Sequence, residues 1–228
     1  MQLVQTILRL TKKDLVIEIR RGELAVMGAL GVIGLSLILA YGVSLASLTP
    51  PSRELLAPSL CLAVLLATSL PLVGKFSDYD AESGALHGLL LAGVASEALY
   101  ISRVISLTIT VFCTALVAML AVPALLGLRL DVMFQSVDPL LVVLGTSVAL
   151  GATGAVMAPI TSRVRVGGMF LLTLLLPLLV PIFFAGCEVL SGEPGTRQFW
   201  WTVLAALSAI YVAIGLWLHP YVVGKGAS

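Results

Sequence analysis

Residues 156–186 read VMAPITSRVRVGGMFLLTLLLPLLVPIFFAG, which is two long apolar stretches separated by a short turn. The turn contains Arg163, Arg165, Gly167 and Gly168. Each stretch, extended to its natural ends, approaches the roughly 20 apolar residues that cross about 30 Å of hydrocarbon as a helix. This part of the sequence therefore predicts two consecutive transmembrane helices joined by a tight connection.

The composition extends this prediction to the whole chain. Of the 228 residues, 59% are hydrophobic and 11% are charged, and the mean hydropathy is +1.10. Because soluble domains carry about 25% charged residues, we expect an all-α membrane protein. The length leaves room for one membrane domain, residues 1–228, and none for a further soluble domain of ordinary size. The net charge of +1 gives no reason to expect nucleic acid as a partner.

Hydropathy predicts six transmembrane helices, over residues 24–47, 55–74, 104–127, 140–160, 167–187 and 199–218. Ten of the 13 Lys and Arg residues then flank the ends of these spans on one side of the membrane, and three, Arg53, Arg129 and Arg197, lie on the other. The positive-inside rule places the richer side in the cytoplasm. We therefore expect a multi-pass protein with both termini in the cytoplasm.

Residues 1–22 predict an amphipathic helix that lies at the membrane interface. At 3.6 residues per turn, eight apolar residues fall on one side of the helix, and the basic residues Arg9, Lys12, Lys13 and Arg20 lie opposite. The apolar residues are Leu3, Val4, Ile7, Leu8, Leu10, Leu15, Ile17 and Ile19. Three further charges, Asp14, Glu18 and Arg21, fall within the apolar half. Because unpaired charges against lipid are costly, we expect these three to pair with one another, with cytoplasmic groups of the same chain or with a partner protein.

The connection over residues 75–103 is the only long one predicted on the cytoplasmic side. It carries Asp78, Tyr79, Asp80, Glu82 and Gly84, and an apolar run from Leu86 to Val94 that is too short to span a membrane. We interpret it as a short surface helix and an acidic docking surface for a cytoplasmic partner. A solvated connection with no partner is the alternative.

The sequence lacks the motifs of nucleotide and zinc chemistry. There is no GxxxxGK[ST] loop and no HExxH, so we predict no catalytic residue and no metal site. His87 and His219 are interpreted as surface residues, and the three cysteines as packing residues. No predicted span carries an acidic or basic residue well inside it, which disfavours an ion-coupled carrier. A permease driven by a separate partner fits better.

Four segments carry a family resemblance: KKDLVIEIRRGE (residues 12–23), DYDAESGALHGLLL (78–91), LGTSVALGATGAV (144–156) and RVRVGGMFLLTLLLPLLVPIFFAG (163–186). Together with the spacing of the predicted helices, they resemble the cytochrome c maturation permease family CcmB, also called haem exporter protein B, within the type-2 ABC permeases. The resemblance covers nearly the whole chain, and the last segment is the most specific.

This resemblance implies a non-catalytic permease subunit of an ABC complex for cytochrome c maturation in the bacterial inner membrane. It implies a separate ATPase subunit of the CcmA type, a haem-handling subunit of the CcmC type, a small CcmD-type subunit, the haem chaperone of the CcmE type and a homodimer within the complex. ATP would then bind to the partner, and the complex would handle haem, with no cofactor bound to this chain. Two alternatives stay open: a generic type-2 exporter permease for a lipid or drug, and a membrane scaffold without transport.

Overall fold

The fold is all-helical. A computed structural model describes residues 2–46, 48–83, 88–89, 92–129, 137–164, 168–193 and 195–224, and these ranges contain no β-strand. The helices are α1 (Gln2–Arg21), α2 (Glu23–Leu45), α3 (Pro50–Ser83), α5 (Ser96–Leu125), α6 (Asp138–Val164), α7 (Gly168–Ser191) and α8 (Arg197–Gly224). The prediction of an all-α protein is confirmed.

Within the described residues, five stretches of helix are long and apolar enough to cross a membrane: Glu23–Leu45, Pro51–Lys75, Ser96–Leu125, Asp138–Met157 and Arg197–Val222. They correspond to five of the six predicted spans. In α7 the described apolar stretch is shorter, Leu176–Ser191. The repeated long apolar helices identify an integral membrane protein.

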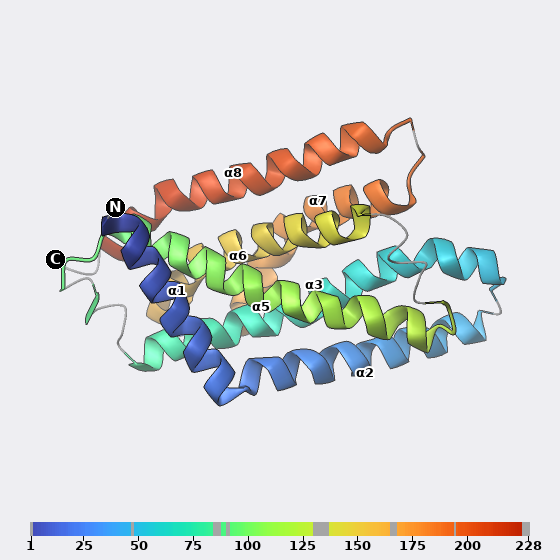
Figure 1. Ribbon diagram of the computed structural model, residues 1–228, viewed down its shortest axis with the longest axis horizontal. Helices are drawn as coiled ribbons and strands as arrows, with labels where there is room; N and C mark the ends of the chain where they lie inside the picture. Colours follow the sequence, from blue (N-terminus) through green and yellow to red (C-terminus); the bar gives the residue numbers. More distant parts are fainter. Residues whose placement is uncertain are drawn as a thin grey trace.

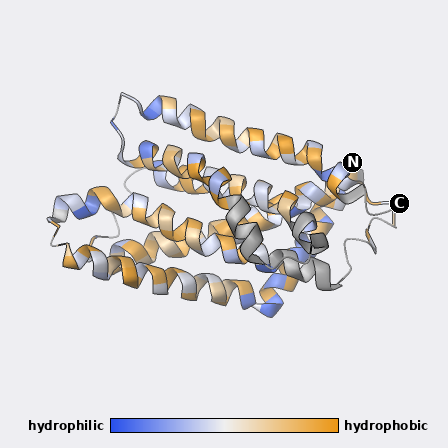
Figure 2. Ribbon diagram, turned by 180° about the vertical axis from the view of Figure 1, so that it is seen from behind, coloured by the Kyte–Doolittle hydropathy of each residue, from blue (hydrophilic) through white to orange (hydrophobic). Residues whose placement is uncertain are grey.

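Helices α2 to α8 run side by side along the long axis of the molecule, and α1 crosses one end of them at an angle (Figure 1). The core lies between α3, α5 and α6, where Leu65, Val111 and Leu150 are fully buried. Of the five long apolar stretches, those in α2 and α8 are the least buried. Hydrophobic residues run along the outer helices, and hydrophilic ones gather near the helix ends (Figure 2), as expected for a bundle whose sides face lipid.

Glycines allow α6 to approach its neighbours closely. A Cβ atom at Gly151 would lie 2.6 Å from Thr108 Oγ1 and 2.9 Å from the Val104 carbonyl oxygen of α5. At Gly154 it would lie 2.7 Å from a methyl carbon of Val73 in α3. Small residues let membrane helices pack backbone to backbone, so these two glycines set the distance between α6 and the rest of the core.

The end of α3 and the start of α5 differ most from the sequence prediction. Helix α3 continues to Ser83 rather than ending at residue 74, and α5 begins at Ser96 rather than at 104. The prediction that residues 75–103 form one long connection is therefore wrong at both ends. Hydropathy marks only the apolar part of a helix, whereas the backbone hydrogen bonds continue through polar turns. The predicted short helix after Gly84 falls mainly on residues 84–87 and 90–91, outside the described part of the chain.

Candidate functional site

Helix α1 attaches to the bundle through a polar face. Ile7 and Thr11 are buried, and Asp14 and Glu18 are half-buried, so every third or fourth residue points toward the neighbouring helices. Helix α1 packs mainly on α5 and touches α2 more lightly. We call this face, Ile7, Thr11, Asp14 and Glu18, the α1 seam. Its centre is polar, although apolar residues dominate that half of the helix.

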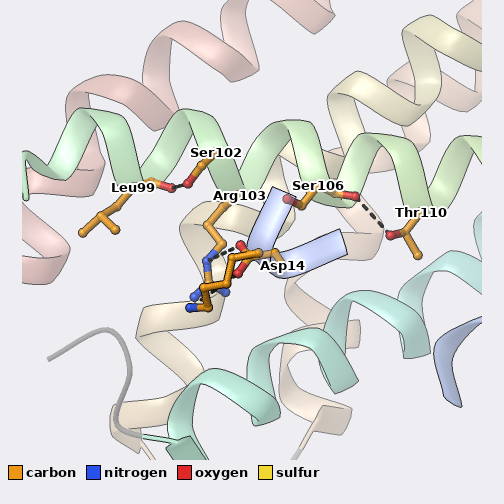
Figure 3. A network of polar contacts seen from close by, with 7 residues as sticks. Asp14, Leu99, Ser102, Arg103, Ser106 and Thr110 are labelled. Carbon is orange, nitrogen blue, oxygen red and sulfur yellow. Dashed lines mark hydrogen bonds and ion pairs between the residues drawn. The ribbon is translucent and has the colours of Figure 1, made fainter. Parts of the chain in front are cut away.

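An ion pair joins α1 to α5 at the middle of the seam. Arg103 Nε lies 3.8 Å from Asp14 Oδ2, and Lys13 Nζ lies 3.7 Å from Asp14 Oδ1 (Figure 3). The Arg103 residue is only 8% exposed. Burial raises the pKa of the Asp14 carboxyl above its ordinary value, while the positive charges of Arg103 and Lys13 oppose that rise. The pair therefore lies in a poorly hydrated contact, where its net energy depends on desolvation as much as on attraction.

Glu18 links α1 to the start of α2. The chain bends at Gly22, whose φ of 63° lies in the left-handed region. Glu18 Oε1 accepts a hydrogen bond from the Leu24 backbone N–H at 3.1 Å, which satisfies a donor that the first turn of α2 leaves free. Burial raises the pKa of the Glu18 carboxyl, and the backbone N–H groups of Leu24 and Ala25 oppose this. Glu18 thus fixes the angle between α1 and α2.

The three charges expected to pair in the apolar half of α1 have separate environments. Asp14 contacts α5, and Glu18 caps α2. Arg21 is exposed, and its charge acts on Glu18. An exposed ion pair next to them, Lys75 Nζ to Glu23 Oε1 at 3.2 Å, connects α3 with α2. One end of the bundle is therefore held together by charges from four helices.

Buried polar side chains continue from Arg103 toward α8. Tyr100 is fully buried, and its hydroxyl lies 3.4 Å from the carbonyl oxygens of Ala152 and Val212. The His219 ring lies 5.4 Å from the Tyr100 ring and is 1% exposed. The interpretation of His219 as a surface residue is wrong, because Pro220 does not end α8 and the helix carries His219 against the start of α5. His87 lies outside the described residues.

Sequence reasoning missed Arg103, Tyr100 and His219 as one cluster. It placed Arg103 in a connection, and it expected no charged residue well inside a span. That expectation is wrong, because Arg103 lies about two turns into α5 and inside the apolar stretch Ser96–Leu125. A signal was present: ALYISRVI (residues 98–105) has apolar residues on both sides of Arg103, a pattern more typical of a helix than of a solvated loop.

The predicted docking residues lie at the end of the bundle that also carries α1. Asp78, Tyr79, Asp80 and Glu82 belong to the last turns of α3, but only their backbone is described, and Gly84 and Leu86 are outside the described residues. Only the backbone is likewise described for Arg163, next to the end of α6 at Val164, and for Gly168, which begins α7. Arg165 and Gly167, in the turn between these helices, are outside the described residues. In the described part of the chain, no group of three His, Cys, Asp or Glu side chains is placed to hold a metal ion.

Comparison with known proteins assigns the chain to a family. The family model described as CcmB protein matches residues 5–226. Heme exporter protein B of Pseudomonas aeruginosa is 30% identical over 180 residues, which cover 76% of this chain and 75% of that protein. No solved structure matches. The match extends over α1, the seam and all later helices, and the chain belongs to the CcmB family.

Proposed function

We propose that the chain is the non-catalytic permease subunit of an ABC complex for cytochrome c maturation. In this proposal it couples ATP hydrolysis by a separate ATPase subunit to haem delivery, through release of the haem-loaded chaperone. The observation that carries the proposal is membership of the CcmB family over residues 5–226. The name of the Pseudomonas relative, Heme exporter protein B, supports a role in haem transport.

The sequence supports an external energy source. It contains no GxxxxGK[ST] loop for ATP phosphates, so hydrolysis requires a partner subunit, which we take to be of the CcmA type. CcmC-type and CcmD-type membrane subunits, the CcmE-type chaperone and a second copy of this chain complete the proposed complex. ATP and haem are then bound by the complex rather than held by this chain as cofactors.

The proposed topology has six spans. Helix α7 has 24 residues, enough to cross the hydrocarbon region, and we assign it as the fifth span. The N-terminus in α1 and the C-terminal end of α8 then lie on the same side of the membrane, because both are at the same end of the bundle (Figure 1). The Lys and Arg residues of α1 lie at that end, whereas Arg53, Arg129 and Arg197 lie at the other. We therefore propose an inner-membrane protein with cytoplasmic termini and with α1 at the cytoplasmic interface.

The proposed coupling surface is the acidic end of α3, followed by Gly84 and Leu86. Asp78, Asp80 and Glu82 belong to its last two turns, on the side where a cytoplasmic ATPase would bind. Carboxylates there can receive charge-assisted hydrogen bonds from a basic cleft on the partner. The turn with Arg163, Arg165, Gly167 and Gly168 opens on the same side in this topology and is a second candidate contact.

The test is a triple variant, Asp78→Ala, Asp80→Ala and Glu82→Ala, in the full chain expressed with the ATPase subunit. We expect normal membrane insertion, because acidic residues contribute little to topology, and reduced ATPase co-purification or impaired chaperone release. The matched control is Glu54→Ala with Glu193→Ala, two exposed acids at the opposite end, which should leave both unchanged. Normal assembly and normal cytochrome c maturation in the triple variant would mean that this segment is a solvated connection.

A generic exporter is the second candidate, and one observation favours it. An apolar groove of about 280 Å³ lies between α2 and α3. It is lined by Met27, Gly31, Leu35, Ala67, Thr68, Pro71 and Leu72. A lipid chain or hydrophobic drug could occupy such a groove. Stimulation of ATP hydrolysis by lipid or drug, without any dependence on the haem chaperone, would support this candidate.

A further inference from the structure

Helix α1 presents a basic face on the side away from its seam. Arg9, Lys12, Lys13 and Arg20 are all exposed. Lys13 is the one that pairs with Asp14. Within the described part of the chain, Arg9, Lys12 and Arg20 have no ion-pair partner. Three free cations are therefore fixed on one side of a helix whose opposite side is anchored by the Asp14–Arg103 pair.

An exposed apolar strip borders this basic face. Val4, Leu8 and Ile19 are 59%, 62% and 79% exposed. At about 100° per residue they fall between the seam and Lys12 on the circumference of the helix. We call these three residues the apolar strip. Exposed aliphatic side chains that lie together on one surface mark a site of contact with a protein or with the membrane.

The position of α1 relates both features to the bilayer surface. Helix α1 ends at Arg21, and the apolar stretch Glu23–Leu45 begins two residues later, after the bend at Gly22. The start of that stretch is at the boundary between hydrocarbon and water. Helix α1 crosses the bundle at this end (Figure 1). Its residues therefore lie at the depth of lipid headgroups, within reach of their phosphates.

We propose that the basic face of α1 binds the headgroups of anionic phospholipids while the apolar strip inserts among their acyl chains. Charge complementarity selects the lipid, since Arg9, Lys12 and Arg20 are free cations and a zwitterionic headgroup offers no net charge to them. The apolar strip adds attraction that does not depend on salt. Because the seam fixes the rotation of α1, the cations and the apolar strip reach the membrane together. This site is independent of the proposed ATPase contact at the end of α3.

The test measures which lipid surrounds α1 in the full-length protein. Cys61, Cys113 and Cys187 are replaced by Ala, Leu8→Cys carries a fluorophore, and the protein is reconstituted in phosphatidylcholine vesicles. A small fraction of lipid bears an acyl-chain nitroxide quencher, on phosphatidylglycerol in one sample and on phosphatidylcholine in the other. We expect stronger quenching by the anionic lipid at low ionic strength, and loss of the difference in high salt.

Two triple variants provide the control. Arg9→Gln with Lys12→Gln and Arg20→Gln should abolish the preference for phosphatidylglycerol, with roughly a fivefold loss of anionic-lipid affinity for each charge removed. Arg9→Lys with Lys12→Arg and Arg20→Lys retains the charge and should retain the preference. Equal quenching by the two lipids in the unsubstituted background would overturn the proposal, and so would the absence of quenching by either. If the unsubstituted background shows no lipid preference and the Gln variant loses ATPase binding, the basic face binds the protein partner instead.

Discussion

At the scale of single residues, the contact between Asp14 and Arg103 determines how α1 is held. Both side chains are largely shielded, and the raised pKa of Asp14 indicates that desolvation exceeds the attraction of nearby cations. Desolvation of the two charges opposes the formation of such a pair. Removing one partner is also destabilising, because the remaining buried charge then loses its compensation. The pair therefore specifies where α1 docks more than it adds to stability.

Removing the Asp14 carboxylate should weaken the folded state. We expect Asp14→Ala to lower the free energy of unfolding in detergent by about 2 kcal/mol, and Asp14→Asn by less, because the polar amide oxygen still faces Arg103 where Ala leaves nothing. The exposed pair is the control: Glu23→Ala, which removes the partner of Lys75, should cost about 0–1 kcal/mol. Equal costs for Asp14→Ala and Glu23→Ala would contradict this account of the seam.

The raised pKa of Asp14 also predicts a pH dependence. A carboxyl with a higher pKa in the folded state binds its proton more tightly there. The contribution of Asp14 to stability is therefore largest below its unfolded pKa of about 3.9, falls as the pH rises through the raised pKa and is constant above it. The difference in unfolding free energy between the unsubstituted chain and Asp14→Asn should show this fall. A difference that does not change with pH would show that the pKa of Asp14 is not raised in the folded state. Glu18 is present in both chains, so its own pH dependence cancels in the difference.

At the scale of helices, the sequence predicted the apolar centres of the spans and failed at their ends. A run of some 20 apolar residues has few alternatives to a membrane helix, so α2, α6 and the start of α8 were found close to their observed bounds. The end of α3 and the start of α5 contain Lys75 and Arg103, which hydropathy assigns to connections. Both cations meet carboxylates of α1 or α2, and that tertiary compensation is invisible in a linear sequence.

Helix packing yields a prediction at two glycines. Gly151→Ala should destabilise the bundle by about 1–3 kcal/mol, because its Cβ would meet Thr108 and the backbone of Val104. A Cβ atom at Gly34 in α2 would have no neighbour within 4 Å. Gly34→Ala should therefore be neutral or stabilising by up to about 1 kcal/mol. Thermal unfolding of the two variants in the same detergent measures both. A neutral Gly151→Ala would show that α6 can move away from α5 without cost.

At the scale of the whole molecule, the distribution of cations follows the arrangement of the helices. The basic residues of α1, with Lys75, lie at one end and Arg53, Arg129 and Arg197 at the other. Single cysteines at Ser83 and Ser191, at opposite ends of the bundle, should react with an impermeant reagent from opposite sides of the membrane. Ser83→Cys should be labelled from the cytoplasm. Labelling of both from one side would exclude the six-span topology.

The candidate site was only partly predictable. The misfit of Asp14 and Glu18 in the apolar half of α1 marked them as residues that contact protein, because charges in that position require partners. Their partners, Arg103 and the Leu24 N–H, depend on how α1 folds back at Gly22. Tyr100 and His219 approach each other across 119 positions only because α5 and α8 pack together, a contact that hydropathy cannot supply.

Purification from the native membrane shows whether the chain is an energised membrane subunit of a cytochrome c maturation complex. The full-length chain carries an affinity tag, and the purified sample is examined for partner subunits, for ATP hydrolysis and for bound haem by absorption spectroscopy. We predict that an ATPase and a haem-handling membrane subunit co-purify, and that ATP hydrolysis accompanies release of the haem-loaded chaperone. A stable preparation with no ATPase subunit and full cytochrome c maturation without ATP hydrolysis would contradict it.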